Sequence, residues 1–131
     1  MDKGDKMTKQ EIIEWAGEEY GTEPEYLWAR YPEFAVLRNP DGKWYGILMN
    51  VPKNKFGLES DEEVEVLNVK ADMMLIDMLV KQPGFYRAYH MNKRRWISIF
   101  LDGSVSEAAI KDLLSDSYEM TRKKRKKRQQ D

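Results

Sequence analysis

The 131-residue chain contains no cysteine, and this absence removes a whole set of chemistries. Without a thiol the protein has no disulfide, no thiolate zinc site, no iron–sulfur cluster and no cysteine nucleophile. The same absence is typical of the reducing cytoplasm, where we expect the protein to reside. The chain has one histidine, His90, so no cluster of histidines can bind a metal ion. We expect His90 to be inert and hydrogen-bonded within a pair of strands.

Several motifs that indicate a function in other proteins are missing as well. No G-x-G-x-x-G or G-K-[ST] element is present to hold phosphates, and no G-x-S-x-G nucleophile elbow occurs. No run approaches the roughly 18 apolar residues of a membrane helix, and the segment "MDKGDKMTKQ" lacks the apolar core of a signal peptide. We therefore expect a non-enzymatic protein with no metal, no cofactor and no membrane insertion.

Charge, by contrast, is abundant and unevenly distributed. Residues 122–131 contain seven basic side chains and one acid, so this segment carries +6, whereas the whole chain carries −1. The preceding 121 residues therefore carry −7. The composition predicts a flexible N-terminus over residues 1–7, one domain over 8–121 and a basic tail over 122–131.

Apolar spacing predicts three helices. Thr8 and Glu11 form a capping box in front of a helix over about residues 8–20. Asp72 is expected to cap a second helix that ends at the turn 83–84, and Ser106 is expected to cap a third. The inward face of that last helix should consist of Ile110, Leu113, Leu114, Ser117, Tyr118 and Thr121.

Strand patterns fill the remaining chain. We predict strands over 26–29, 34–39, 43–51 and 64–71, and a hairpin of two strands within 85–101. The turn 39–42 is strongly specified, because Pro40 fixes φ and Gly42 accepts the backbone that closes the turn. Strands joined by short turns form an antiparallel sheet, here with the helices largely on one face. The predicted class is α+β, in the order α-β3-β-α-β2-α.

In the last hairpin, the alternation assigns each side chain of the first strand to one face of the sheet. One face should carry Phe85, Arg87 and Tyr89, and the other Tyr86, Ala88 and His90. The return strand, "WISIFL", is apolar on both faces and should therefore lie in a central position.

Three long segments and several short signatures carry a family resemblance. The segments are "YPEFAVLRNPDGKWYGILMNV", "LNVKADMMLIDMLVKQPGFYRAYHMNKRRWISIFLDGSV" and "IKDLLSDSYEM". The short signatures are Pro83-Gly84, Ala88-Tyr89-His90, Asn92-Lys93, Trp96-Ile97 and Ser117-Tyr118. In these residues the chain resembles the MmcQ/YjbR family of small bacterial proteins over about residues 8–121. The resemblance implies a secretion-chaperone-like α+β domain, sometimes described as a double wing. Members are usually labelled DNA-binding proteins, an inference from their fold.

The hairpin tip and the tail are candidates for nucleic-acid binding. Cations neutralise phosphates and flat rings stack on bases, and both kinds of side chain are interleaved in the hairpin. The candidate residues are Arg87, His90, Lys93, Arg94, Arg95, Trp96, Arg122, Lys123, Lys124, Arg125, Lys126, Lys127 and Arg128. The competing interpretation is that the rings belong to the sheet core, the cations solubilise a turn and the tail solubilises the chain end.

Other functions also fit the sequence. The apolar strand "WISIFL", together with exposed tryptophans, could bind a protein partner or a second copy of the chain. A small-molecule pocket lined by Trp15, Trp28 or Trp44 is a third possibility. The acidic run "ESDEE" at 59–63 lacks the spacing of a calcium loop and indicates a solvated loop. The partners that remain open are therefore DNA, RNA, another protein and a homodimer.

Overall fold

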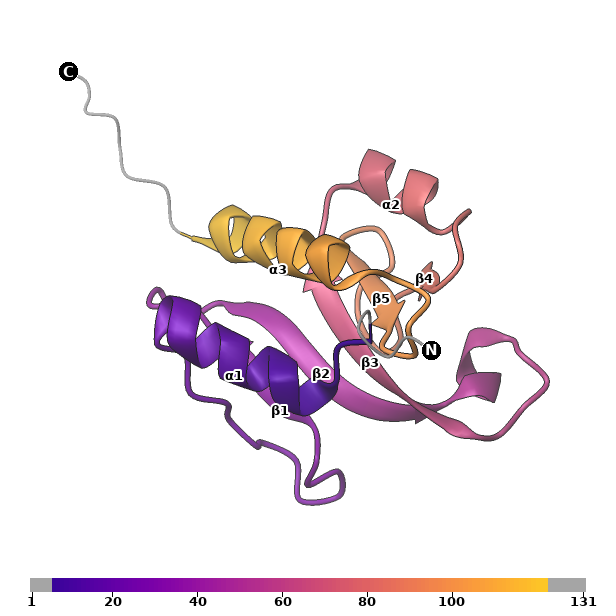
Figure 1. Cartoon of the computed structure of the whole chain (residues 1–131), viewed down its shortest axis with the longest axis horizontal. Coiled ribbons are helices and arrows are strands. Elements are labelled where there is room, and N and C mark those ends of the chain that lie inside the picture. The colour runs from indigo at the N-terminus through magenta and orange to yellow at the C-terminus, as the bar shows by residue number, and fades with distance from the viewer. Residues whose placement is uncertain (1–5, 123–131) are drawn as a thin grey trace.

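A computed structural model describes residues 6–122, which form a five-stranded antiparallel sheet and three α-helices (Figure 1). In chain order the elements are α1 (Lys9–Tyr20), β1 (Ala35–Arg38), β2 (Trp44–Pro52), the 3-10 helix η2 (Lys53–Phe56), β3 (Glu63–Lys70), α2 (Met73–Leu79), β4 (Phe85–Arg87), β5 (Trp96–Phe100) and α3 (Glu107–Thr121). The α+β class is confirmed. No helix within residues 6–122 is long and apolar enough to cross a membrane.

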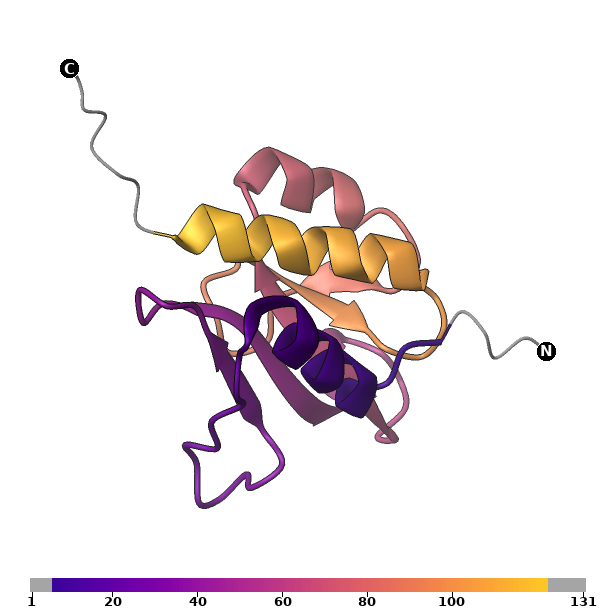
Figure 2. The same cartoon turned by 60° about the vertical axis from the view of Figure 1, so that its left-hand side comes forward.

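The strands lie side by side in the order β1-β2-β3-β5-β4. Strand β5 therefore lies between β3 and β4, and every residue from 96 to 100 is buried. The central position predicted for "WISIFL" is confirmed. Helices α1 and α3 lie next to each other over one face of the sheet, and α2 lies beyond α3 (Figure 2).

Local capping signals define where the helices begin. The Thr8 hydroxyl accepts a hydrogen bond from the Glu11 amide at 3.1 Å, and the Glu11 carboxylate accepts one from the Thr8 amide at 2.9 Å. This capping box satisfies two amides that a helix N-terminus leaves without an intrahelical partner. Asp72 and Ser106 cap α2 and α3 in the same way, and all three sequence predictions are confirmed.

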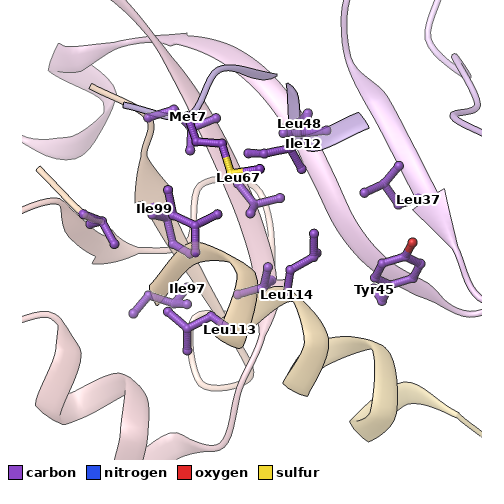
Figure 3. Close-up of a cluster of buried hydrophobic side chains, with 14 of the residues drawn as sticks. Met7, Ile12, Leu37, Tyr45, Leu48, Leu67, Ile97, Ile99, Leu113 and Leu114 are labelled. Carbon is purple, nitrogen blue, oxygen red and sulfur yellow. The ribbon is translucent and has the colours of Figure 1, made fainter. Parts of the chain in front are cut away.

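The face of the sheet under the helices holds the larger part of the core. Leu48 and Leu67 of the sheet lie beneath Ile12 of α1 and Leu114 of α3, and all four side chains have no exposed surface (Figure 3). The predicted inward face of α3 is buried at every position, from Ile110 to Thr121. The second apolar layer lies on the opposite face of the sheet and is covered by loops and by η2 rather than by α-helices.

The predicted strand over residues 26–29 is wrong. None of these four residues belongs to a strand. Two successive turns follow over 28–34, in which the Trp28 carbonyl accepts a hydrogen bond from the Tyr31 amide and the Tyr31 carbonyl accepts one from the Phe34 amide. An isolated bridge between Glu25 and Val36 lies just before the segment. Proline at position 32 lacks the amide proton that a ladder needs, so the extended pairing is not continued.

The predicted first strand of the last hairpin is too long. Strand β4 ends at Arg87, and residues 88–95 form a loop. Tyr89 consequently lies in the second apolar layer together with Tyr86, on the face opposite Phe85, so the predicted face assignment of Tyr89 is wrong. His90 has φ of 62°, a left-handed conformation that a strand does not contain. Its predicted place within a strand pair is therefore also wrong.

The buried side chain of Tyr45 should make the free energy of unfolding depend on pH in the alkaline range. Its ring is fully buried, and its hydroxyl lies 2.5 Å from the Thr22 hydroxyl. Burial raises the pKa of Tyr45 to about 12, against the opposing effect of the Thr22 hydrogen bond. Because the pKa in the folded state is higher than the ordinary value of 10, the folded state holds its proton more tightly than the unfolded chain. The stabilisation is complete below pH 10 and is lost as the pH rises toward 12.

We expect the free energy of unfolding to fall by up to about 3 kcal/mol between pH 10 and pH 12 because of this one group. Urea unfolding of the wild type and of Tyr45→Phe across that range measures it. The variant should be less stable by about 1 kcal/mol at neutral pH, where it lacks the Thr22 hydrogen bond, and the difference should shrink or reverse at high pH. A constant difference at all pH values contradicts this account.

Candidate functional site

Two structural features bear on function, and the first is the end of the sheet where β3 finishes and β5 begins. The Ala71 amide donates a hydrogen bond to the Arg95 carbonyl at 2.9 Å, which holds the predicted hairpin tip against the end of β3. Asn39, at the end of β1, donates to the Thr121 hydroxyl at 2.8 Å. The last turn of α3 therefore lies at the same end of the sheet. We call this end of the sheet the basic end. Its predicted cations are Arg87, Lys93, Arg94, Arg95 and Arg122.

Two of the predicted cations at the basic end are paired with carboxylates. Arg87 lies 3.0 Å from Asp77 of α2, and Arg122 lies 3.4 Å from Asp41 of the β1–β2 turn. All four side chains are at least a quarter exposed, so these pairs contribute little to stability. Their effect on function is to offset the positive charge of Arg87 and Arg122.

The positive charges of the other loop cations are not offset by a carboxylate within residues 6–122. Lys93 donates to the Ala88 carbonyl at 2.8 Å, a neutral group that leaves the ammonium charge uncompensated. Arg94 and Arg95 are exposed, and within residues 6–122 neither has a carboxylate at ion-pair distance. These three adjacent side chains are therefore the predicted cations of the basic end that form no ion pair within residues 6–122.

Two further cations at this end were not predicted from the sequence. Lys70 pairs with Trp96 across β3 and β5, and Lys43 leads into β2 beside the last turn of α3. Neither has an ion-pair partner within residues 6–122. Their sequence neighbours are apolar or uncharged, so only the register of the sheet brings them together. The acidic run at 59–63 lies at the opposite end, where β3 begins.

The remaining predicted site residues are Trp96, His90 and the six cations at 123–128. Trp96 is buried in β5 with 9% of its surface exposed, so its ring is not available to stack on a base, and that prediction is wrong. His90 is exposed on the loop. Residues 123–128, which contain the six remaining cations of the predicted tail, lie outside the described residues.

The second feature is an aromatic cavity of about 330 Å³ on the face of the sheet that the helices leave free. Its walls include Trp28, Tyr31, Phe34, Trp44, Tyr89 and His90, and aliphatic and methionine side chains complete the lining. The rings of Trp28 and Trp44 stand perpendicular to each other at 5.8 Å between centroids. Of the three tryptophans predicted to line a pocket, Trp28 and Trp44 do so, whereas Trp15 lies on the helix side of the sheet.

A second hollow adjoins this cavity along the edge strand β4. It measures about 410 Å³, and the side chains of Lys55, Arg87 and Lys93 contribute to its lining. We call it the cationic hollow. Tyr89 belongs to the walls of both spaces, so the aromatic cavity and the cationic hollow are neighbours.

A buried polar pair holds Tyr89 in this position. Asn68 of β3 and Ser98 of β5 are register partners with no exposed surface, and the Ser98 hydroxyl donates to the Asn68 carbonyl oxygen at 2.5 Å. The Asn68 amide donates to the Tyr89 carbonyl, and the Tyr89 amide donates to the Ser98 hydroxyl, each at 3.1 Å. These bonds form a closed ring that satisfies both buried side chains and fixes the Tyr89 backbone.

The pair Asn68 and Ser98 was not predicted, although the sequence contains a signal for it. Each is the single polar residue within an otherwise apolar stretch of strand, "VLNV" and "WISIF". Such residues are costly to bury unless they have partners, which is a reason to look for a shared structural task.

The expectation of exposed tryptophans, on which a protein-docking function rested, is wrong, since Trp96 is buried and Trp15, Trp28 and Trp44 are partly buried.

Known bacterial proteins are similar to this chain in sequence. A Bacillus subtilis protein, YyaQ, is 38% identical over 117 residues, which cover 88% of this chain and 99% of YyaQ. The protein YbdF of Escherichia coli O157:H7 is 31% identical over 97 residues, covering 73% of this chain and 70% of YbdF.

Solved structures of bacterial proteins are also similar to this chain. A crystal structure of a Pseudomonas syringae protein has a TM-score of 0.86 at 40% identity, covering 88% of this chain and 100% of that one. A Deinococcus radiodurans protein with a DUF419 domain, at 19% identity and a TM-score of 0.70, has the same fold; the match covers 95% of this chain and 84% of that one. The family model for YjbR matches residues 18–120. This chain therefore belongs to the YjbR family.

Proposed function

We propose that the protein is a non-enzymatic nucleic-acid-binding protein that holds the phosphate backbone at its basic end. The observation that carries the proposal is that loop 93–95 and the last turn of α3 lie at the same end of the sheet. The loop 93–95 is bonded to the end of β3, and α3, which leads into the basic segment 122–128, is bonded to the end of β1. A polyanion that lies across this end of the sheet can therefore contact loop 93–95 and the end of α3, where the basic segment begins.

The overall charge makes this arrangement necessary. Residues 1–121 carry −7, so the protein body repels a polyanion that approaches it from most directions. At physiological salt such interactions are screened beyond about 8 Å, and a cluster of uncompensated cations determines the local attraction. Arg94 and Arg95, which have no carboxylate at ion-pair distance within residues 6–122, are the side chains best placed to supply it.

The double variant Arg94→Gln, Arg95→Gln tests this proposal. We expect its affinity for a fluorescent 25-base-pair duplex to fall at low salt, and the slope of log affinity against log salt to become shallower by about 2, because two phosphate contacts are lost. Fluorescence anisotropy at several salt concentrations measures both quantities. Folding should be unaffected, since both side chains are exposed and make no ion pair among the described residues.

A matched control is available at the opposite end of the sheet. Lys6 and Lys81 are exposed cations, and their replacement by glutamine changes the net charge equally. We expect this control to alter the salt slope much less. An equal loss in both double variants contradicts a localised site, and a wild-type protein that fails to bind any polynucleotide at about 50 mM salt contradicts the proposed function itself.

A further inference from the structure

Binding of the phosphate backbone at the basic end gives no role to the aromatic cavity, and it involves only Arg87 and Lys93 of the cationic hollow. The aromatic cavity lies on the face of the sheet that has no α-helix, the cationic hollow lies along the edge strand β4, and Tyr89 lines both. An aromatic space and a cationic space that share one residue match a ligand with a flat ring at one end and an anion at the other.

The walls of the cavity are mainly aromatic rings. Tyr31 and Phe34 are stacked at 4.7 Å with 16° between their planes, and Trp28 and Trp44 close the space with perpendicular rings. At about 330 Å³ the volume is near the lower limit of ordinary ligand pockets, about 300–1,000 Å³. Aromatic walls of this kind attract planar heterocycles through stacking and tolerate any base, because every base has a π-face.

The neighbouring charges exclude the other common guest of an aromatic pocket, a quaternary ammonium group. Lys55 and Lys93 of the cationic hollow have no carboxylate at ion-pair distance within residues 6–122, and only Arg87 is paired, with Asp77. A cation would be repelled here. A phosphate, in contrast, would find three cationic side chains around one hollow.

We propose that the aromatic cavity binds the base of an unpaired nucleotide and that the cationic hollow binds its phosphate. Tyr89 stands between the two spaces as a ribose stands between a base and its phosphate. His90, in the cavity wall, offers an imidazole that can hydrogen-bond to the edge of the base. The inference rests on the proposed function and deepens it, since it names an unpaired strand, or a free nucleotide with the same chemistry, as the ligand.

The buried ring of Asn68 and Ser98 supports this assignment independently. It fixes both the amide and the carbonyl of Tyr89, the residue that the two spaces share. His90 follows directly in the left-handed conformation, which turns the chain along the cavity wall. A wall fixed before the ligand arrives reduces the ordering cost of binding.

The first test compares single-stranded and duplex oligonucleotides of equal length by anisotropy with the full chain. We expect the single strand to bind more tightly by about 10- to 100-fold, the range that stacking of one base supports. Trp44→Leu should remove this preference while leaving duplex affinity unchanged. Trp15→Phe, on the opposite face of the sheet, is the matched control and should keep the preference.

The second test uses mononucleotides and does not depend on strand binding. AMP should quench the fluorescence of Trp28 and Trp44, and adenosine should do so with about tenfold lower affinity because it lacks the phosphate. Lys55→Gln should remove the advantage of AMP without altering adenosine. Lys55 is exposed and has no ion-pair partner within residues 6–122, so this variant keeps its fold even where Trp44→Leu does not.

The outcomes separate this inference from the proposed function. Equal binding of single strand and duplex, without quenching by AMP, overturns the cavity assignment and leaves duplex binding in place. Quenching by AMP without binding of either oligonucleotide supports the cavity assignment for a free nucleotide and overturns the proposed function. A preference for the single strand without quenching by AMP assigns the cavity to strands alone.

Discussion

Removal of residues 123–131 should weaken binding to duplex DNA about a thousandfold or more at 0.1 M salt. The deleted segment contains six cations, and each phosphate that a cation neutralises adds about 0.9 to the salt exponent. The slope of log affinity against log salt should therefore become shallower by about 5. What remains, residues 1–122, carries −6 and keeps only the other cations of the basic end as a local attraction. Anisotropy titrations from about 50 to 200 mM salt measure the change.

The deletion starts at Lys123. Arg122, at the end of α3, therefore keeps its contact with Asp41 of the β1–β2 turn. Two variants of full length serve as controls. Replacement of the six cations in 123–128 by glutamine should reproduce the loss, whereas the same nine residues in shuffled order should keep nearly all of the affinity. Binding by the truncated chain that equals that of the full chain would show that the segment has no part in recognition.

The sequence predicted the helices well because their signals are local. The pair Thr8 and Glu11 specifies a helix start within four residues, and the buried face of α3 follows from the spacing of a single segment. The turn at 39–42 is specified in the same way, and its Asn39 carbonyl accepts the closing hydrogen bond from the Gly42 amide at 2.8 Å. None of these features needs information from another part of the chain.

The parts that could not be predicted depend on contacts between distant residues. Alternation assigned Tyr89 to the face of Phe85, but Asn68 and Ser98, 21 and 9 residues away, hold the Tyr89 backbone and end the strand before it. The aromatic cavity likewise draws its walls from the segment before β1, from β2 and from the β4–β5 loop. No window of sequence contains that combination.

The basic end shows the same limit. Loop 93–95 was identified from sequence because its cations are adjacent, whereas only the strand order brings Lys43 and Lys70 to the same end of the sheet. Charge composition revealed that a cationic segment exists. The antiparallel register decides which other cations lie next to it.

Substitution of Gly84 by alanine should destabilise the fold by about 2–5 kcal/mol. Gly84 has φ of 89°, and an added Cβ would lie 2.7 Å from both Ser104 Cβ and Val105 Cγ2. The first effect is the cost of a left-handed residue that carries a side chain, about 1–2 kcal/mol, and the second is the overlap with a packed loop, about 1–3 kcal/mol. Because the Gly84 carbonyl accepts a hydrogen bond from the Phe100 amide at 2.8 Å, the backbone here cannot shift freely.

Gly57 provides the control that separates these two costs. Its φ of 85° is nearly the same, but an added Cβ there would have nothing within 4 Å. Gly57→Ala should therefore show the conformational cost alone, about 1–2 kcal/mol, and urea unfolding of both variants gives the steric part by difference. The difference should appear as a fall in melting temperature of several degrees beyond that of Gly57→Ala. Equal stabilities for the two variants would mean that the loop 104–105 moves aside without cost, and that the turn at Gly84 is held by its backbone conformation only.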